Sequence, residues 1–117
     1  MRKFVIPSLL FAAFGSIAAH AHAFLDHASP LVGSTVASAP REVSLTFTQN
    51  LESAFSSVQV TGANGARVDQ GKPQISGNTM RVSLKSLSSG TYRVRRQALS
   101  VDTHKTEGNF TFHVGGP

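Results

Sequence analysis

The sequence predicts an all-β protein built as an antiparallel β-sandwich. Apolar and polar residues alternate in short runs, most clearly in Val43-Ser44-Leu45-Thr46-Phe47-Thr48, as expected for a strand with one buried face. Turn-forming pairs such as Asn64-Gly65 separate these runs. The sequence after residue 21 has no run with the period of a long helix. Short strands joined by turns are typical of two packed antiparallel sheets.

Residues 1–21 are expected to be a signal peptide, which leaves residues 22–117 as a single β-sandwich domain. Arg2 and Lys3 precede a run of apolar and small residues, and Ala19-His20-Ala21 has the small-x-small pattern of a cleavage site. A transmembrane anchor is the alternative, but the run of residues 4–19 is shorter than the roughly 20 residues that span a bilayer. Export with cleavage after Ala21 is therefore predicted.

The composition restricts the kinds of partner and site. The 117 residues carry a formal net charge of +5, which falls to +3 when Arg2 and Lys3 leave with the signal. Arg93 and Arg95 share one strand face and form a modest basic stripe, but no nucleic-acid-binding motif is present, so no nucleic-acid partner is predicted. Because the chain has no cysteine, a metal would be held by nitrogen, oxygen or thioether donors.

The first half of the domain is predicted to contain a lead-in, two strands and a hairpin. The extended lead-in covers residues 22–31 and ends at turn signals. One strand opens at Pro40 and runs through the alternation described above. Another covers residues 56–61, with Val58 and Val60 facing inward. Ala63-Asn64-Gly65 predicts a hairpin with a type I′ turn, whose returning strand is Ala66 to Asp69.

The second half is predicted to alternate loops with three strands. Residues 71–77, which include Pro73, and residues 103–108 are expected to be loops. The strands are residues 78–85, residues 91–99 and a final strand in which His113 faces solvent. Arg96 falls on the inward face of its strand and is expected near the edge of the core. The side chains expected in the core are Met80, Val82, Leu84, Tyr92, Val94, Ala98, Phe110, Phe112 and Val114.

Asp102 and His104 are the residues from which a metal site is predicted. They follow the strand of residues 91–99, and residues two apart in extended backbone face the same side. If the extension continues past Leu99, a carboxylate and an imidazole lie side by side. A polar strand end is the alternative interpretation of this pair taken alone.

His22 would supply further donors once it becomes the amino-terminal residue. Its α-amine and its own imidazole Nδ1 can chelate one metal ion, and metal can displace the amine proton near neutral pH. With His104 the set has three nitrogens, and Asp102 adds an oxygen or orients a ligand. Three nitrogens and one oxygen in a tetragonal arrangement favour Cu(II). His27, beside Asp26, is a possible accessory ligand.

The chain resembles the CopC family of periplasmic copper-binding proteins over essentially all of residues 22–117. The resemblance implies an immunoglobulin-like, Greek-key β-sandwich of about seven strands, located in the periplasm. The matching segments are His22 at the cleavage site, Ala28-Ser29-Pro30 with Gly33-Ser34, Leu45-Thr46-Phe47-Thr48-Gln49-Asn50-Leu51, Gly90-Thr91-Tyr92-Arg93-Val94, Ser100-Val101-Asp102-Thr103-His104 and Gly108-Asn109-Phe110-Thr111-Phe112.

The same resemblance implies that His22 and His104 bind one Cu(II) per chain, with Asp102 as a ligand or close neighbour. A monomer that acts with an inner-membrane copper-transport protein is expected. The sequence departs from the family pattern in three places. Gln49 stands where some members have glutamate and is a possible accessory residue only. Arg96 stands where several have tryptophan. The methionine-rich loop of some members is missing, so no Cu(I) methionine site is expected.

Three functions follow as hypotheses. The first is a Cu(II) carrier or buffer for copper resistance or homeostasis, which is not an enzyme. The second is a copper-dependent oxidative enzyme of the polysaccharide monooxygenase type. The lack of tryptophan and the predicted inward position of Tyr92 argue against this enzyme, because no aromatic surface for a sugar is evident. The third is a metal-free interaction module. Cleavage after Ala23 instead of Ala21 would favour the third, because it would remove His22.

Overall fold

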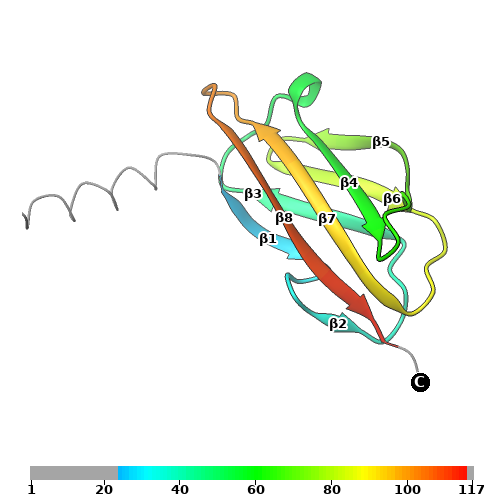
Figure 1. The fold of residues 1–117 in the computed structure, drawn as a ribbon. Helices are drawn as coiled ribbons and strands as arrows, with labels where there is room; N and C mark the ends of the chain where they lie inside the picture. Colours follow the sequence, from blue (N-terminus) through cyan, green and yellow to red (C-terminus); the bar gives the residue numbers. More distant parts are fainter. Residues whose placement is uncertain (1–23, 116–117) are drawn as a thin grey trace, which may run out of the picture.

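The computed structural model describes residues 24–115, so the predicted signal peptide and His22 lie outside the described residues. Within that range the all-β prediction is confirmed, and the two sheets form a sandwich (Figure 1). A single turn of 3-10 helix, η2 (Ser53–Phe55), precedes β4, and no described helix is long and apolar enough to cross a membrane. The strands are β1 (Leu25–Ser29), β2 (Thr35–Val36), β3 (Glu42–Phe47), β4 (Ser57–Gly62), β5 (Asp69–Ser76), β6 (Thr79–Leu84), β7 (Gly90–Leu99) and β8 (Lys105–Val114).

Each sheet has four strands. One has the order β1-β3-β6-β5 and the other β2-β8-β7-β4, and every pairing is antiparallel except the short parallel pair of β2 with β8. The chain leaves the first sheet after β3 and enters the second at β4. The connection that follows β3 lies beside the loop that joins β7 to β8, and Leu51 and Ser100 form a β-bridge there. This end of the sandwich therefore brings together residues about 50 positions apart.

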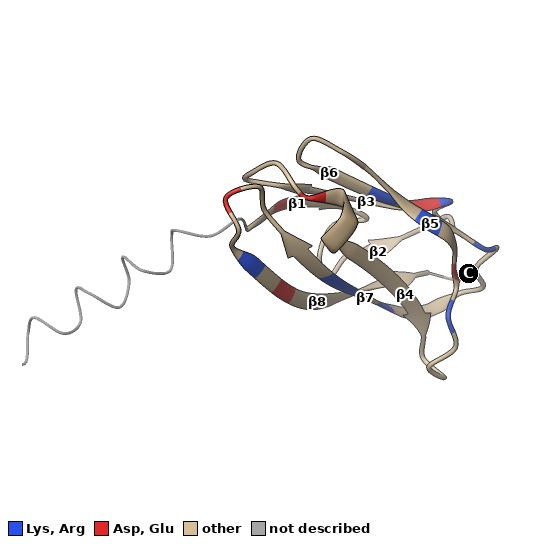
Figure 2. Cartoon of the chain, turned by 90° about the horizontal axis from the view of Figure 1, so that it is seen from above, with Lys and Arg blue, Asp and Glu red and all other residues tan. Residues whose placement is uncertain are grey.

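The predicted core is confirmed. All nine residues predicted in the second half are buried, as are Val58 and Val60 and the three apolar residues of β3. Tyr92 points inward as predicted; its hydroxyl donates to the Ser88 carbonyl at 2.6 Å and its ring stacks on Phe112. Arg93 and Arg95 lie exposed on β7, and charged residues are scattered over both sheets instead of forming one basic surface (Figure 2).

The predicted hairpin at Asn64-Gly65 is present, but its turn is not of type I′ and its returning strand is short. Among the described residues between β4 and β5, only Gly65 has a positive φ, at 86°, whereas a type I′ turn needs two such residues. The returning segment, residues 66–68, pairs with β4 through the Thr61–Arg67 bridge and through one backbone hydrogen bond on each side of it, and the chain then joins the other sheet at Asp69. Asp69 turns inward because its carboxylate accepts the backbone N–H of Val60 at 2.9 Å.

Two predicted loops are largely strands. Most of residues 71–77 belongs to β5, an edge strand with an irregular register between Gln70 and Gln74, where Pro73 is tolerated because an edge leaves some N–H positions unpaired. Most of residues 103–108 belongs to β8, which pairs with β7 from Lys105 onward. The lead-in also forms β1, paired with β3. These segments lack strong apolar alternation, so the sequence pattern did not identify them.

Candidate metal centre

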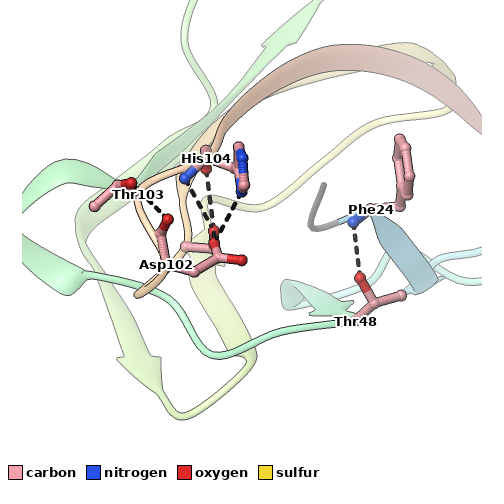
Figure 3. A network of polar contacts seen from close by, with 6 residues as sticks. Phe24, Thr48, Asp102, Thr103 and His104 are labelled. Carbon is pink, nitrogen blue, oxygen red and sulfur yellow. Dashed lines mark hydrogen bonds and ion pairs between the residues drawn. The ribbon is translucent and has the colours of Figure 1, made fainter. Parts of the chain in front are cut away.

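The strand extension predicted beyond Leu99 is wrong, but the side-chain pair that it predicted is present. β7 ends at Leu99, and residues 100–104 form a tight turn in which Thr103 has a φ of +72° and donates its N–H to the Ser100 carbonyl at 2.8 Å. The turn brings His104 Nδ1 within 3.3 Å of Asp102 Oδ1, as Figure 3 shows. Turn geometry thus replaces strand alternation as the reason that the two side chains meet.

The Asp102 carboxylate is held by hydrogen bonds and remains open to solvent. The Ser100 hydroxyl donates to its Oδ1, and the side chain is 43% exposed. The hydrogen bond from Ser100, with a smaller contribution from His104, lowers the pKa of Asp102 although partial burial opposes the shift. The carboxylate is therefore ionised at neutral pH and can act as an oxygen donor to a cation.

Gln49, predicted as a possible accessory residue, contacts this carboxylate. Only the nitrogen of its amide can donate, and with that nitrogen facing Asp102 it lies 2.9 Å from Oδ2 and 3.2 Å from Oδ1. Gln49 comes from the connection after β3, and the next residue, Asn50, accepts the N–H of Val101 at 3.0 Å. The two loops are thus joined through both backbone and side chains.

The first described residue is hydrogen-bonded to the same connection. Phe24 donates its N–H to Thr48 Oγ1 at 2.9 Å (Figure 3). Thr48 in turn donates its N–H to the Phe24 carbonyl at 2.9 Å. Thr48 directly precedes Gln49, which touches Asp102. His22 lies two residues before Phe24, outside the described residues, and two residues of extended chain span roughly 7 Å.

Other candidate residues are not brought to Asp102 by any described contact. His27 lies on β1, mostly exposed, with Nδ1 3.8 Å from the carboxylate of Asp26. His113 lies near the end of β8 remote from the turn, where its Nδ1 is 2.8 Å from Thr91 Oγ1. Met80 is fully buried in the core. Among the described residues, the polar cluster at this end thus consists of Asp102, His104 and their hydrogen-bonding neighbours.

The pair of donors fits a shared metal ion. Two donors each about 2.0–2.2 Å from one ion lie about 3 Å apart when they are at right angles, close to the 3.3 Å between His104 Nδ1 and Asp102 Oδ1. Within residues 24–115 no group of three or more histidine, cysteine, aspartate or glutamate side chains is arranged to hold a metal. The two nitrogens predicted for His22 would be further donors from outside the described range.

Sequence reasoning missed three features of this end. Ser100 is fully buried and hydrogen-bonds with Asp102, but a lone serine after a strand gives no signal in the sequence. Thr48 was assigned only to the polar face of its strand. Two phenylalanine side chains, Phe24 and Phe55, are substantially exposed, the latter at 66% on η2. Neither phenylalanine lies in a run that alternates with polar residues, so the sequence does not predict which way its ring faces.

Comparison with known proteins identifies relatives of this chain. The family model described as the CopC domain matches residues 25–115. Protein YobA of Escherichia coli K12 is 34% identical over 102 residues, which cover 80% of this chain and 79% of YobA. The copper transport protein CutJ of Bacillus subtilis is 35% identical over 111 residues, which cover 92% of this chain but only 20% of CutJ.

A solved structure shares the fold. The crystal structure of PcoC, a methionine-rich copper resistance protein from Escherichia coli, superposes with a TM-score of 0.69 at 34% identity. The superposition covers 81% of this chain and all of PcoC. The sandwich described above is therefore the same architecture.

Proposed function

The chain belongs to the CopC family, and on that premise we propose that it is a periplasmic Cu(II)-binding protein that buffers or carries copper for resistance or homeostasis. CutJ is named as a copper transport protein and PcoC as a copper resistance protein, which supports copper as the metal that is bound. The observation that supports the site most directly is the pair of donors, His104 Nδ1 and Asp102 Oδ1, 3.3 Å apart.

The proposed site binds one Cu(II) with the amine and imidazole of His22, the imidazole of His104 and the carboxylate of Asp102. Phe24 is hydrogen-bonded to Thr48, next to the residue that touches Asp102, so a chain starting at His22 begins within reach of the pair. Three nitrogens and one oxygen suit the tetragonal geometry of Cu(II). Asp102 acts as a ligand, or as the group that orients His104.

A second, Cu(I) site made of methionines is not part of the proposal. Thioether sulfur is the soft donor that Cu(I) prefers. The chain has two methionines, of which Met80 is buried between the sheets and Met1 belongs to the predicted signal peptide. This composition contrasts with that of PcoC, whose title describes it as methionine-rich.

Export is part of the same proposal, since the amine of His22 exists only after cleavage at Ala21. Cleavage after Ala23 would remove the residue and two of the nitrogens. We also infer a membrane copper transporter as partner, because in CutJ the matching segment is about a fifth of a larger copper transport protein. The protein would act as a monomer.

The oxidative-enzyme alternative receives little support from the described surface. Tyr92 is buried, and the chain has no tryptophan to stack against a sugar. The exposed rings of Phe24 and Phe55 are the aromatic surfaces that such a substrate would need to use. Release of oxidised oligosaccharides by the copper-loaded protein with peroxide would support the enzyme instead.

The intact mass of the exported protein, measured with and without one equivalent of Cu(II), tests the proposal. The expected result is a chain that begins at His22 and retains one copper. The His104→Ala variant should not retain the copper ion. His113→Ala serves as the control, because His113 lies on β8 away from the turn, and this variant should retain the ion. A chain that begins at His22 but holds no copper would contradict the carrier function.

A further inference from the structure

We propose that Ser100 and Gln49 are positioning residues that hold the Asp102 carboxylate beside His104, so that half of the metal site is formed before copper arrives. The inference rests on the proposed Cu(II)-binding function. It extends that function by assigning roles to a buried hydroxyl and a neutral amide that are not themselves candidate ligands.

Ser100 is the centre of the turn. It is fully buried, its N–H donates to the His104 carbonyl at 3.0 Å, and its own carbonyl accepts the N–H of Thr103 at 2.8 Å. Its hydroxyl lies near two acceptors, Asp102 Oδ1 and the His104 carbonyl, the latter at 3.2 Å. A hydroxyl has one proton to donate, and an ionised carboxylate is the stronger acceptor, so the proton is directed to Asp102.

The same oxygen also contacts the backbone of His104. The N–H of His104 lies 3.3 Å from Ser100 Oγ, whose lone pairs can accept it while the proton points to Asp102. One buried hydroxyl therefore links the carboxylate and the backbone that carries the imidazole. The buried Ser100 hydroxyl therefore restrains the distance between the side chains of Asp102 and His104.

Gln49 contacts the carboxylate from the other loop. Its amide nitrogen reaches Oδ2 at 2.9 Å and Oδ1 at 3.2 Å, so both carboxylate oxygens have a neutral donor. Because neither Ser100 nor Gln49 is charged, Asp102 keeps its full negative charge for a cation. A lysine or arginine at either position would neutralise that charge and compete with the metal.

These contacts should matter for affinity because an unrestrained aspartate samples several rotamers. Restricting the side chain during folding removes that entropic cost from the binding step. Residues that orient metal ligands typically change affinity by about 10- to 100-fold when they are replaced. We therefore expect Ser100→Ala and Gln49→Leu each to weaken Cu(II) binding by at least about tenfold.

The test is a Cu(II) competition titration against a chromophoric chelator, made on the mature native protein, Ser100→Ala, Gln49→Leu and the double variant. Gln59→Leu on β4, the same substitution away from both loops, serves as the matched control and should bind copper as the native protein does. The double variant should lose less affinity than the two single losses combined, because both residues act on one carboxylate. Electron paramagnetic resonance of the copper-loaded variants should show an altered spectrum.

A readout that needs no metal separates this inference from the proposed function. Nitrogen-15 NMR of the His104 ring in the metal-free protein should differ between the native protein and both variants, because the ring loses its fixed neighbour. Unchanged ring signals in both variants, or copper affinities within twofold of native, would overturn the positioning roles. If the native protein fails to bind copper, the proposed function fails, and the ring signals alone still decide whether Ser100 and Gln49 fix the pair. If Ser100→Ala fails to fold, the His104 ring signals and the copper affinity of Gln49→Leu provide the test.

Discussion

Two aspartates at opposite ends of the sandwich are both held ionised, but by different kinds of group. Asp69, at the start of β5, has a side chain that is 4% exposed, and it accepts two hydrogen bonds from Arg67, at 2.9 and 2.8 Å, and one from the Val60 N–H. Asp102 is 43% exposed and is held by a hydroxyl and an amide. The pKa of each carboxyl is lowered, chiefly by Arg67 in the first case and by Ser100 in the second.

The difference separates a structural carboxylate from one that is available for binding. Arg67 neutralises Asp69, and the pair joins the end of β4 to the opposite sheet. Neutral donors fix the position of Asp102, and no lysine or arginine among the described residues is paired with its carboxylate. We expect replacement of Asp69 to change the free energy of unfolding, and replacement of Asp102 to change metal binding.

Removal of the Asp69 side chain should have the largest effect on stability. Asp69→Ala leaves the Val60 N–H buried without its acceptor and should reduce the free energy of unfolding by about 3 kcal/mol. Urea unfolding measures this change. Asp26→Ala, which removes an exposed carboxylate from β1, is the control and should change stability by less than about 0.5 kcal/mol. Equal losses in the free energy of unfolding for Asp69→Ala and Asp26→Ala would contradict a structural role for the Asp69 carboxylate.

The same carboxylate should make stability depend on pH in acid. Since the pKa of Asp69 is lower in the folded protein, its contribution is present above the unfolded value of about 3.9 and is lost as the pH falls through the lower folded value. Urea unfolding between pH 2 and 6 should show a decline below about pH 4 that is smaller in Asp69→Asn. An identical decline in that variant would assign the acid sensitivity to other groups.

Copper should stabilise the end that Asp102 occupies. At free Cu(II) about 100-fold above the dissociation constant, binding adds about 2.7 kcal/mol, or roughly 10–20 °C in Tm for a domain of this size. Calorimetry should show this rise in the native protein and in Asp69→Ala, but not in His104→Ala. A rise that persists in His104→Ala would place the bound copper elsewhere.

Removal of the Asp102 side chain should affect binding more than folding. Asp102→Ala should lower Cu(II) affinity at least about tenfold, which is 1.4 kcal/mol, because the site loses an oxygen donor or the group that orients His104. The metal-free stability should change by less than about 1 kcal/mol, since the side chain is half exposed. Chelator competition and urea unfolding on the same sample compare the two quantities. A loss of stability as large as that of Asp69→Ala would contradict the comparison.

Arg96 extends the comparison to a cation that is paired with no carboxylate in residues 24–115. Burial lowers its pKa, its Nε is buried and without a hydrogen-bond partner among the described residues, and its guanidinium lies over Gly108. Arg96→Leu should therefore raise the free energy of unfolding by about 1 kcal/mol, measured in urea. Arg95→Leu, the neighbouring residue on the exposed face, should produce no such gain. Destabilisation by Arg96→Leu would mean that the guanidinium has a favourable partner.

Much of the fold was predictable because strand burial follows a local pattern of period two. Val43, Leu45 and Phe47 are buried because they alternate with polar residues. The same reasoning failed for β5 and for the first half of β8, where the exposed residues leave no alternation to read. Pairing with β6 and β7 makes these segments strands, and pairing depends on residues far away in the sequence.

The sequence by itself determined the sandwich and its buried faces, and it indicated Asp102 and His104 as candidate ligands, since these depend on residue type and local spacing. The tertiary structure decided how the two side chains meet and what surrounds them. The turn at Thr103, and not an extended strand, brings them together. Gln49 reaches the carboxylate only because the loops after β3 and β7 close the same end of the sandwich, whereas Ser100 contacts it from within the same turn. Hydrogen bonds between such distant residues depend on strand register and chain reversal, which no local pattern encodes.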